Sequence, residues 1–80
     1  MSIRQITADE VLVALEEMDA GKYPYVEIER RESGVRIASA LAENPDGSWS
    51  YARSGDHASL AAAIVALRDE LRRRREGSRA

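Results

Sequence analysis

The sequence contains no cysteine and only one histidine, and each scarcity excludes a group of functions. Without cysteine there is no disulfide framework, no thiolate metal site and no cysteine nucleophile. A single histidine cannot supply the cluster that holds many metal ions, so we expect no metal cofactor. No apolar run approaches the roughly 18 residues of a membrane-spanning helix, and segment 1–5 lacks the apolar stretch of a secretion signal. We therefore expect a cytoplasmic protein without membrane contacts.

Motifs that mark enzymes are missing as well. The chain has no Gly-rich phosphate loop, no dinucleotide fingerprint and no Gly-x-Ser-x-Gly elbow. His57 lies near Asp56 and Ser59, but residues adjacent in sequence do not form the geometry of a hydrolase triad. Glu27 and Glu29 are spaced ~7 Å apart along a strand, but a strand of a small sheet provides no cleft around them. The sequence therefore predicts a protein that is not an enzyme and binds no cofactor.

The composition is that of one small folded domain. The chain has 80 residues, of which 44% are hydrophobic and 32% are charged, and its formal net charge is −2. This balance favours folding over disorder, and the length leaves no room for a second domain. We expect an ordered core over about residues 7–75 and a flexible tail over residues 76–80.

A helix is predicted close to the N-terminus. Thr7 and Glu10 have the spacing of a capping box, in which each side chain satisfies a free backbone N–H of the first turn. Apolar residues then recur at helical spacing, and Gly21 suits the left-handed position that ends many helices. We predict a helix over residues 8–20.

Three strands are predicted in the middle of the chain, over residues 25–31, 35–41 and 49–51, because polar and apolar residues alternate there. Ser33-Gly34 suits a two-residue hairpin turn. The segment Asn44 to Gly47 suits a type I turn followed by a glycine bulge. The two turns predict an antiparallel sheet with its strands in sequence order.

A second helix is predicted over about residues 57–75, with Asp56 or Ser54 as its cap. The apolar stripe that indicates it consists of Leu60, Ile64, Leu67 and Leu71. The order of elements is then α-β-β-β-α. We predict an α+β fold with a single two-layer domain, in which both helices cover one face of a three-stranded antiparallel sheet.

The turns also predict which residues share a face of the sheet. The bulged turn pairs Leu41 with Tyr51 and Glu43 with Trp49, and the two-residue turn pairs Val26 with Leu41. We therefore expect the large apolar residues to face the helices, namely Val26, Ile28, Val35, Ile37, Leu41, Trp49 and Tyr51. The opposite face is then either solvated or a docking surface, and it carries Tyr25, Ala38, Ala40 and Ala42.

The second helix is apolar nearly all round, and one sheet cannot bury a whole helix circumference. A homodimer would hide this excess, since one self-complementary patch is enough for a two-fold dimer. The possible dimer surface on this helix consists of Ala58, Ala62, Val65 and Ala66, with the small-residue face of the sheet as the alternative. Alanine is also the best helix former, which explains the same composition without a partner.

Acidic residues are concentrated in the first part of the chain. Residues 1–21 carry one basic and five acidic residues, whereas residues 54–80 carry six basic and four acidic residues. Acidic side chains on the first helix and the first strand would meet the basic surface of a protein partner. These candidate partner-binding residues are Asp9, Glu10, Glu16, Glu17, Asp19, Glu27 and Glu29.

A run of arginines near the C-terminus has two interpretations. It consists of Arg68, Arg72, Arg73, Arg74 and Arg75. Such a patch can contact phosphates or an acidic protein surface. It can equally be a solvated helix end, where cations complement the negative end of the helix dipole. Direct nucleic-acid binding is therefore the alternative to protein binding.

The α-β-β-β-α order and the alanine-rich second helix resemble the double-stranded RNA-binding domain over nearly the whole chain. That family has a basic cluster at the start of its second helix, whereas residues 56–60 here read Asp-His-Ala-Ser-Leu. The resemblance therefore implies the topology and not the RNA contacts.

The overall profile resembles a second group, the anti-CRISPR proteins of phages and mobile elements, which are small, compact proteins without catalytic residues. This resemblance implies a protein that binds a nucleic-acid-handling complex, such as a CRISPR effector, and inhibits it by protein–protein contact. We predict a non-enzymatic, acidic binding protein of this kind. The alternatives are a nucleic-acid-binding module that uses the arginine run and an oligomerising structural subunit.

Overall fold

The computed structural model describes residues 5–77 and contains five elements. These are α1 (Ala8–Ala20), β1 (Val26–Arg30), β2 (Arg36–Glu43), β3 (Trp49–Arg53) and α2 (Leu60–Gly77). The strands form one antiparallel sheet in the order β1-β2-β3. The predicted α+β fold with the order α-β-β-β-α is confirmed. Of the expected tail, residues 76–77 belong to α2, and residues 78–80 lie outside the described residues.

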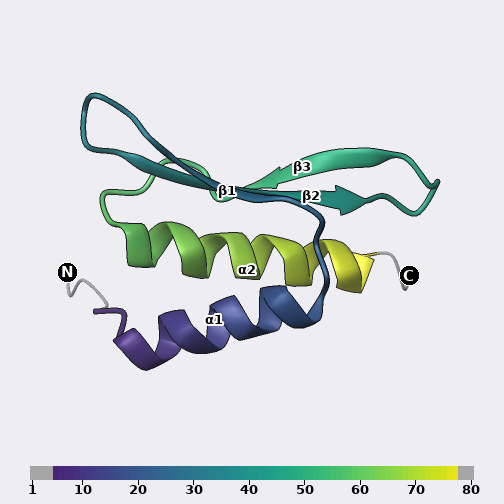
Figure 1. Cartoon of the computed structure of the whole chain (residues 1–80), viewed down its shortest axis with the longest axis horizontal. Coiled ribbons are helices and arrows are strands. Elements are labelled where there is room, and N and C mark those ends of the chain that lie inside the picture. Colours follow the sequence, from purple (N-terminus) through teal and green to yellow (C-terminus); the bar gives the residue numbers. More distant parts are fainter. Residues whose placement is uncertain (1–4, 78–80) are drawn as a thin grey trace.

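Both helices lie on the same side of the sheet, with α2 next to the strands and α1 packed against α2 (Figure 1). α2 approaches β2 and β3, whereas no Cα atom of α1 lies within 8 Å of a Cα atom of any strand. Within residues 5–77, neither helix combines the length and apolar character that crossing a membrane requires. The opposite face of the sheet, which we call the outer face, carries no helix of the described chain.

α1 begins and ends where the sequence predicts, but its last turn differs from the expectation. The Oγ1 of Thr7 accepts a hydrogen bond from the backbone N–H of Glu10 at 3.2 Å, as in a capping box. Gly21 is not left-handed, since its φ is −72°, and Lys22 takes the positive φ of 55° instead. Glycine is needed at position 21 for space, because a Cβ there would lie 2.6 Å from Cε2 of Tyr23.

α2 begins three residues later than expected, because the preceding residues belong to the sheet. The backbone of His57 pairs with that of Arg36 through two hydrogen bonds of 2.7 and 3.0 Å. The Oγ of Ser54 accepts a hydrogen bond from the N–H of Ala38 at 2.9 Å. The predicted cap at Asp56 or Ser54 is therefore wrong. Ser59 caps the helix, with its Oγ accepting from the N–H of Ala62 at 3.1 Å.

The hairpin between β2 and β3 has the predicted register. Leu41 lies opposite Tyr51, and the N–H of Gly47 donates to the carbonyl of Asn44 at 2.9 Å. Gly47 has a φ of +88°, the left-handed conformation that the bulged turn requires. The type I turn with a glycine bulge is confirmed.

The hairpin between β1 and β2 is one residue longer than predicted. The N–H of Gly34 donates to the carbonyl of Arg31 at 2.9 Å, which closes a turn with Gly34 at a φ of +88°. Val26 therefore lies opposite Ala40 and not opposite Leu41. Because successive side chains alternate between faces, this shift moves the side chains of β1 to the other face relative to β2.

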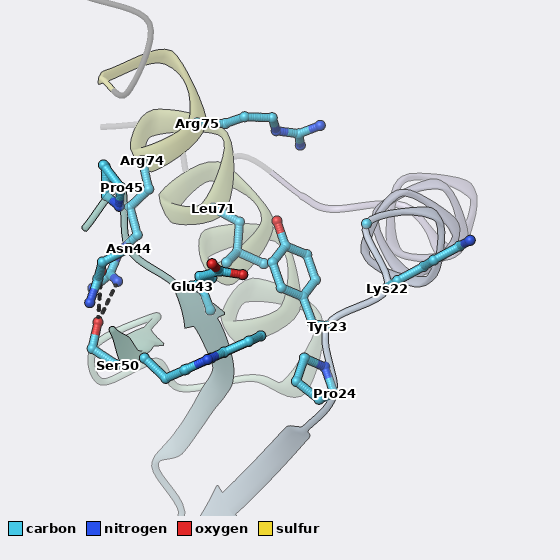
Figure 2. Close-up of a pocket in the computed structure, with 13 residues that line it drawn as sticks. Lys22, Tyr23, Pro24, Glu43, Asn44, Pro45, Ser50, Leu71, Arg74 and Arg75 are labelled. Carbon is cyan, nitrogen blue, oxygen red and sulfur yellow. Dashed lines mark hydrogen bonds between the residues drawn. The ribbon is translucent and has the colours of Figure 1, made fainter. Parts of the chain in front are cut away.

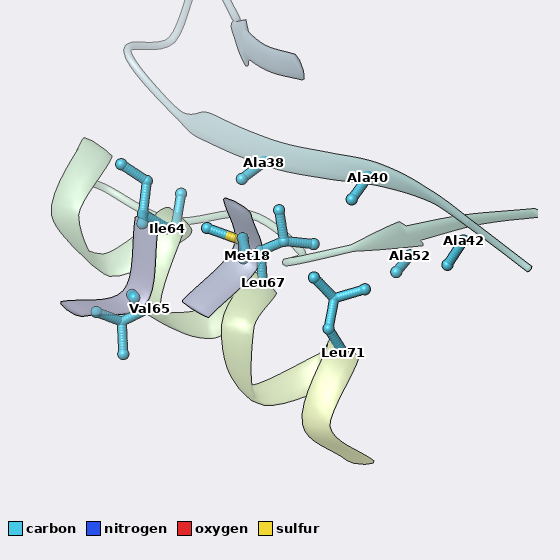
Figure 3. Packing of buried hydrophobic residues seen from close by; sticks show 11 residues of the cluster. Met18, Ala38, Ala40, Ala42, Ala52, Ile64, Val65, Leu67 and Leu71 are labelled. Atoms are coloured by element: carbon cyan, nitrogen blue, oxygen red, sulfur yellow. The ribbon is translucent and has the colours of Figure 1, made fainter. Parts of the chain in front are cut away.

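The core lies against the alanine face of the sheet, which reverses the predicted assignment of faces. The alanines of β2 and β3 are buried against large side chains of α2, and α1 contributes two residues to the same cluster (Figure 3). The cluster consists of Ala14, Met18, Ala38, Ala40, Ala42, Ala52, Ala63, Ile64, Val65, Leu67 and Leu71. Alanine lets the helix approach the strands closely, so Leu67 and Leu71 fill the space that larger strand residues would need.

Most of the side chains that we expected in the core are therefore elsewhere. Leu41, Trp49 and Tyr51 lie on the outer face, together with Ile37, which is nevertheless buried. Val26 and Ile28 point to the helix side but remain half-exposed, because α2 lies under β2 and β3 and not under β1. The predicted assignment of side chains to the two faces was wrong because both faces of β2 are apolar, and the smaller residues form the inner face.

The surfaces that we expected to form a dimer are largely used inside the monomer. Ala38, Ala40 and Ala42 are buried against α2, so they cannot form an exposed docking face. Val65 is buried as well, because α1 packs against α2 and contributes Ala14 and Met18 to the same cluster. Of the other predicted positions, Ala62 and Ala66 are half-buried, and Ala58 and Tyr25 are exposed. The second helix therefore finds its additional partner in α1 of the same chain.

Candidate protein-binding surface

Large apolar side chains form a continuous row on the outer face of the sheet. The N–H of Leu41 donates to the carbonyl of Tyr25 at 2.9 Å on one side, and Tyr51 lies opposite Leu41 on the other. The rings of Tyr25 and Tyr51 meet edge to face, with a centroid distance of 6.4 Å and an interplanar angle of 83°. Together with Trp49, on the same face, these residues form what we call the aromatic face: Tyr25, Leu41, Trp49 and Tyr51.

The aromatic face is open to solvent. The exposed fractions are 49% for Tyr25, 51% for Trp49 and 47% for Tyr51. Single exposed apolar residues are ordinary on protein surfaces, but a contiguous cluster of aromatic side chains is characteristic of an interaction site. A solvated face of an antiparallel sheet would carry polar residues in alternation. The aromatic face is thus the strongest candidate for a binding surface in the described chain.

Carboxylates border the aromatic face. Glu27 and Glu29 follow Tyr25 on the same side of β1, and Glu43 lies opposite Trp49. Hydrogen bonding to the carboxylate of Glu27 is the main cause that raises the pKa of the Tyr25 hydroxyl. Glu29 forms an ion pair with Arg31 at 3.6 Å between two exposed side chains. Such a pair is screened by water and exchanges readily for another partner.

The predicted acidic surface is divided between two parts of the molecule. Glu27 and Glu29 lie on the outer face, whereas the acidic residues of α1 lie on the other side of the sheet. Glu17 is engaged within the chain, because the guanidinium of Arg72 donates to its carboxylate. The remaining acidic residues of α1 lie in its first turn, at Asp9 and Glu10, and at the exposed positions Glu16 and Asp19. The structure therefore does not bring the seven acidic residues into one surface.

The arginine run is largely engaged inside the chain. Arg68 pairs with Asp69 at 2.9 Å, Arg73 pairs with Glu70, and Arg72 reaches across to α1. Arg74 holds α2 to β3, since Nη1 donates to the Oγ of Ser50 and Nη2 to the carbonyl of Tyr51, both at 3.2 Å. Arg72 and Arg74 thus join α2 to other elements, whereas Arg68 and Arg73 pair with acidic residues of α2 itself.

An open pocket of about 710 Å³ lies at the end of the molecule where the two helices end (Figure 2). Its walls come from the link between α1 and β1, the turn between β2 and β3, and the last turns of α2. Tyr23, Pro24, Pro45 and Leu71 provide apolar walls, and Trp49 of the aromatic face is also part of the lining. The pocket therefore extends the aromatic face at one end and offers space for an apolar side chain of a partner.

Histidine and acidic side chains are scattered over residues 5–77. No three histidine or acidic side chains gather there in a way that could hold a metal ion. The single histidine, His57, lies beside β2, where its backbone pairs with Arg36. Its Nε2 lies 3.0 Å from the carbonyl oxygen of Ser54. This residue has a local structural partner, and the neighbouring Asp56 is exposed.

Comparison with protein-family models, with curated proteins and with solved structures finds no match for this chain. The two resemblances described from the sequence stay predictions.

The sequence contained one signal for this surface that we interpreted differently. Four alanines occupy alternate positions of two adjacent strands, at Ala38, Ala40, Ala42 and Ala52. Small residues in such a row allow a helix to lie close to a sheet, which makes them as suitable for the core as the larger residues beside them. Assigning them to the core would have placed Leu41, Trp49 and Tyr51 on the outer face.

Proposed function

We propose that this protein is a non-enzymatic binding protein whose aromatic face recognises a basic surface of a protein partner. The observation that carries this proposal is the exposed Tyr25–Tyr51 pair on a sheet face bordered by Glu27 and Glu43. Tyrosine and tryptophan are the residues that most often dominate binding energy when a partner covers them. The apolar side chains of the aromatic face, which run across the strands, would supply the centre of the interface.

The carboxylates would supply selectivity. Acidic groups at the rim of an apolar patch accelerate encounter with a basic surface and disfavour acidic partners. Proteins that handle nucleic acids present such basic surfaces to phosphates. We therefore favour a partner of this class, which is also what the anti-CRISPR resemblance implies, and a protein bound there would inhibit by occupying the nucleic-acid-binding surface.

The proposal is tested with purified chain immobilised on a support and exposed to a panel of basic nucleic-acid-binding proteins. We expect salt-sensitive retention of at least one of them, lost in Tyr51→Ser and in the pair of charge reversals Glu27→Lys and Glu43→Lys. The matched control reverses Glu16 and Asp19 on α1, which should leave retention unchanged. The proposal would be contradicted if the charge reversals on α1 abolished retention and the outer-face variants left it unchanged.

Two further measurements address the other predicted partners. A gel-shift with duplex DNA and RNA at about 50 mM salt, where phosphate contacts are strongest, should show no complex. A shift that disappears when Arg73 and Arg75 are replaced would favour the nucleic-acid alternative instead. The homodimer stays a prediction, and light scattering at tens of micromolar reports the mass of the free protein directly.

A further inference from the structure

β1 has a free edge with its own hydrogen-bonding groups exposed. The carbonyl of Tyr25 accepts from Leu41 of β2, and the N–H of Arg31 donates to Val35 just before β2, both at 2.9 Å. The odd-numbered residues of this strand therefore direct their backbone groups to β2. Backbone groups alternate in direction along an antiparallel pair. The N–H and carbonyl groups of Val26, Ile28 and Arg30 therefore point away from the sheet, where no strand of residues 5–77 pairs with them.

The opposite edge of the sheet is protected. The bonds between Asn44 and Ser48 and between Ser54 and Ala38 show that even-numbered residues of β3 face β2. The carbonyl of Tyr51 therefore points outward, and Arg74 of α2 donates to it at 3.2 Å. Proteins commonly guard edge strands in this way against pairing with other chains. Within residues 5–77, β1 pairs in a regular register and contains neither a proline nor a bulge.

The helix side of β1 is also uncovered. Val26 and Ile28 point toward the helices, yet each residue is 45% exposed. α2 lies under β2 and β3, and α1 packs on α2 without approaching a strand closely. In Figure 2, α1 lies on the same side of α2 as β1. Apolar area under this edge strand is thus open to solvent.

α1 presents apolar side chains toward the same space. Ala14 and Met18 face α2. Because successive residues are rotated by about 100° around a helix axis, Leu15 and Glu17 lie on opposite sides of this contact. The flank of Glu17 is remote from the strands, because the hollow around Glu17 is lined only by residues of the two helices. Leu15, with Leu12 beyond it, therefore lies on the flank that faces the sheet, and both are exposed.

We propose that the free edge of β1 is a strand-addition site that binds an extended protein segment with alternating basic and apolar residues. The inference deepens the proposed function, on which the basic character of the partner rests. The segment would pair with the outward groups of Val26, Ile28 and Arg30 as a fourth strand. Its apolar residues would cover Leu12 and Leu15, and its basic residues would lie beside Glu27 and Glu29 on the outer face.

Charge decides between this occupant and a second copy of the chain. The register that pairs the outward groups of Val26, Ile28 and Arg30 with those of a second β1 is centred on Ile28, and it places Glu27 opposite Glu29 twice. Like charges directly opposite in a sheet are destabilising. A strand with lysine or arginine at these positions gives attractive pairs instead, and the exposed Glu29–Arg31 pair exchanges readily. A foreign basic strand is therefore favoured over self-pairing.

The test uses the full 80-residue chain and a fluorescent heptapeptide that alternates lysine with isoleucine and valine. Two control peptides share its apolar residues, one with glutamate in place of lysine and one with the same composition in a non-alternating order. We expect anisotropy to show binding of the alternating lysine peptide, at least tenfold tighter than either control. The double variant Glu27→Lys with Glu29→Lys should reverse the preference to the glutamate peptide.

Hydrogen exchange locates the peptide. At saturation, the amides of Val26, Ile28 and Arg30 should exchange at least tenfold more slowly, while the amides of Tyr51 and Arg53 on the protected edge keep their rates. Protection at β3, or protection of the β1 amides in the free chain by self-association, would overturn the proposal. Equal binding of the three peptides would overturn it as well.

One variant separates this proposal from the proposed function. Tyr51→Ser changes the aromatic face on β3 and leaves the edge of β1 intact, so it should retain peptide binding while losing the partner protein. If Tyr51→Ser abolishes peptide binding and the Glu27 and Glu29 reversals do not, the peptide occupies the aromatic face. The strand-addition site then fails while the proposed function stands.

Discussion

Arg72 on α2 donates two hydrogen bonds to the carboxylate of Glu17 on α1, with Nε–Oε2 and Nη2–Oε1 distances of 2.6 and 2.5 Å. The two residues are 55 positions apart in the sequence and close the helix pair on the flank remote from the strands. Parallel bonds from one guanidinium to both carboxylate oxygens are the strongest geometry for such a pair. The hydrogen bond from Arg72 lowers the pKa of Glu17, and the same contact raises the pKa of Arg72.

This ion pair predicts a pH-dependent part of the stability. The pKa of Glu17 is lowered in the folded state, so its contribution is fully present above the ordinary carboxyl value of 4.5 and is lost as the pH falls through the folded value. Glu17→Gln should reduce the free energy of unfolding by ~1 kcal/mol at pH 7, since solvent screens a pair that is partly exposed. At pH 3 the difference should shrink. Urea unfolding at both pH values measures it.

Arg72→Gln is the matched control for that experiment, because it removes the donor and leaves the carboxyl in place. It should reproduce the loss at pH 7 and the convergence with the wild type in acid. An unchanged difference between wild type and Glu17→Gln at the two pH values would contradict the assignment of the stability to this pair.

Gly21→Ala should destabilise the protein although the backbone conformation at this position suits alanine. A glycine-to-alanine change in a relaxed helical conformation normally stabilises by ~0.4–1 kcal/mol. Here the added Cβ would lie 2.6 Å from Cε2 of Tyr23, whose ring packs against the core. We expect a loss of ~1 kcal/mol or more, as in other overpacked sites. Thermal unfolding in wild-type and Tyr23→Ala backgrounds measures it, and the penalty should vanish without the ring.

Ala40→Leu should be strongly destabilising, because Ala40 is fully buried where α2 approaches the sheet. Extra methylene groups in a packed core cost ~1–3 kcal/mol. The matched control is Glu27→Leu on the outer face of β1, which should change the free energy of unfolding by less than ~0.5 kcal/mol. Chemical unfolding of both variants is the measurement. Comparable losses at the two positions would contradict the observed orientation of the sheet.

Ser54→Ala should loosen the junction between β3 and α2. The Oγ of Ser54 accepts from the N–H of Ala38 at 2.9 Å and donates to the carbonyl of Gly55 at 2.7 Å. Leaving a partly buried backbone N–H without its acceptor costs ~1–3 kcal/mol. Hydrogen exchange should show faster loss of the Ala38 amide proton in this variant. The exposed Ser33 provides the control, since Ser33→Ala should change neither stability nor exchange at Ala38.

Local signals in the sequence were enough to define most elements. Thr7 capped α1 as its spacing with Glu10 indicated, and the turn from Asn44 to Gly47 set the register of β2 against β3. Both features depend on residues within a few positions of each other, whose conformational preferences act without the rest of the chain. The start of α2 was misplaced because His57 pairs with Arg36, a partner from β2.

The sequence by itself determined the order of elements, the alternation of side chains along each strand and the pairing of Leu41 with Tyr51. Only the tertiary structure decided which side of the sheet became the core. Both faces of β2 are apolar, so alternation could not distinguish them, and the outcome depended on volume. Small side chains at Ala38, Ala40 and Ala42 leave room for Leu67 and Leu71 of a closely packed α2, whereas the larger set would hold the helix away. That choice is what placed the aromatic side chains on the outer face.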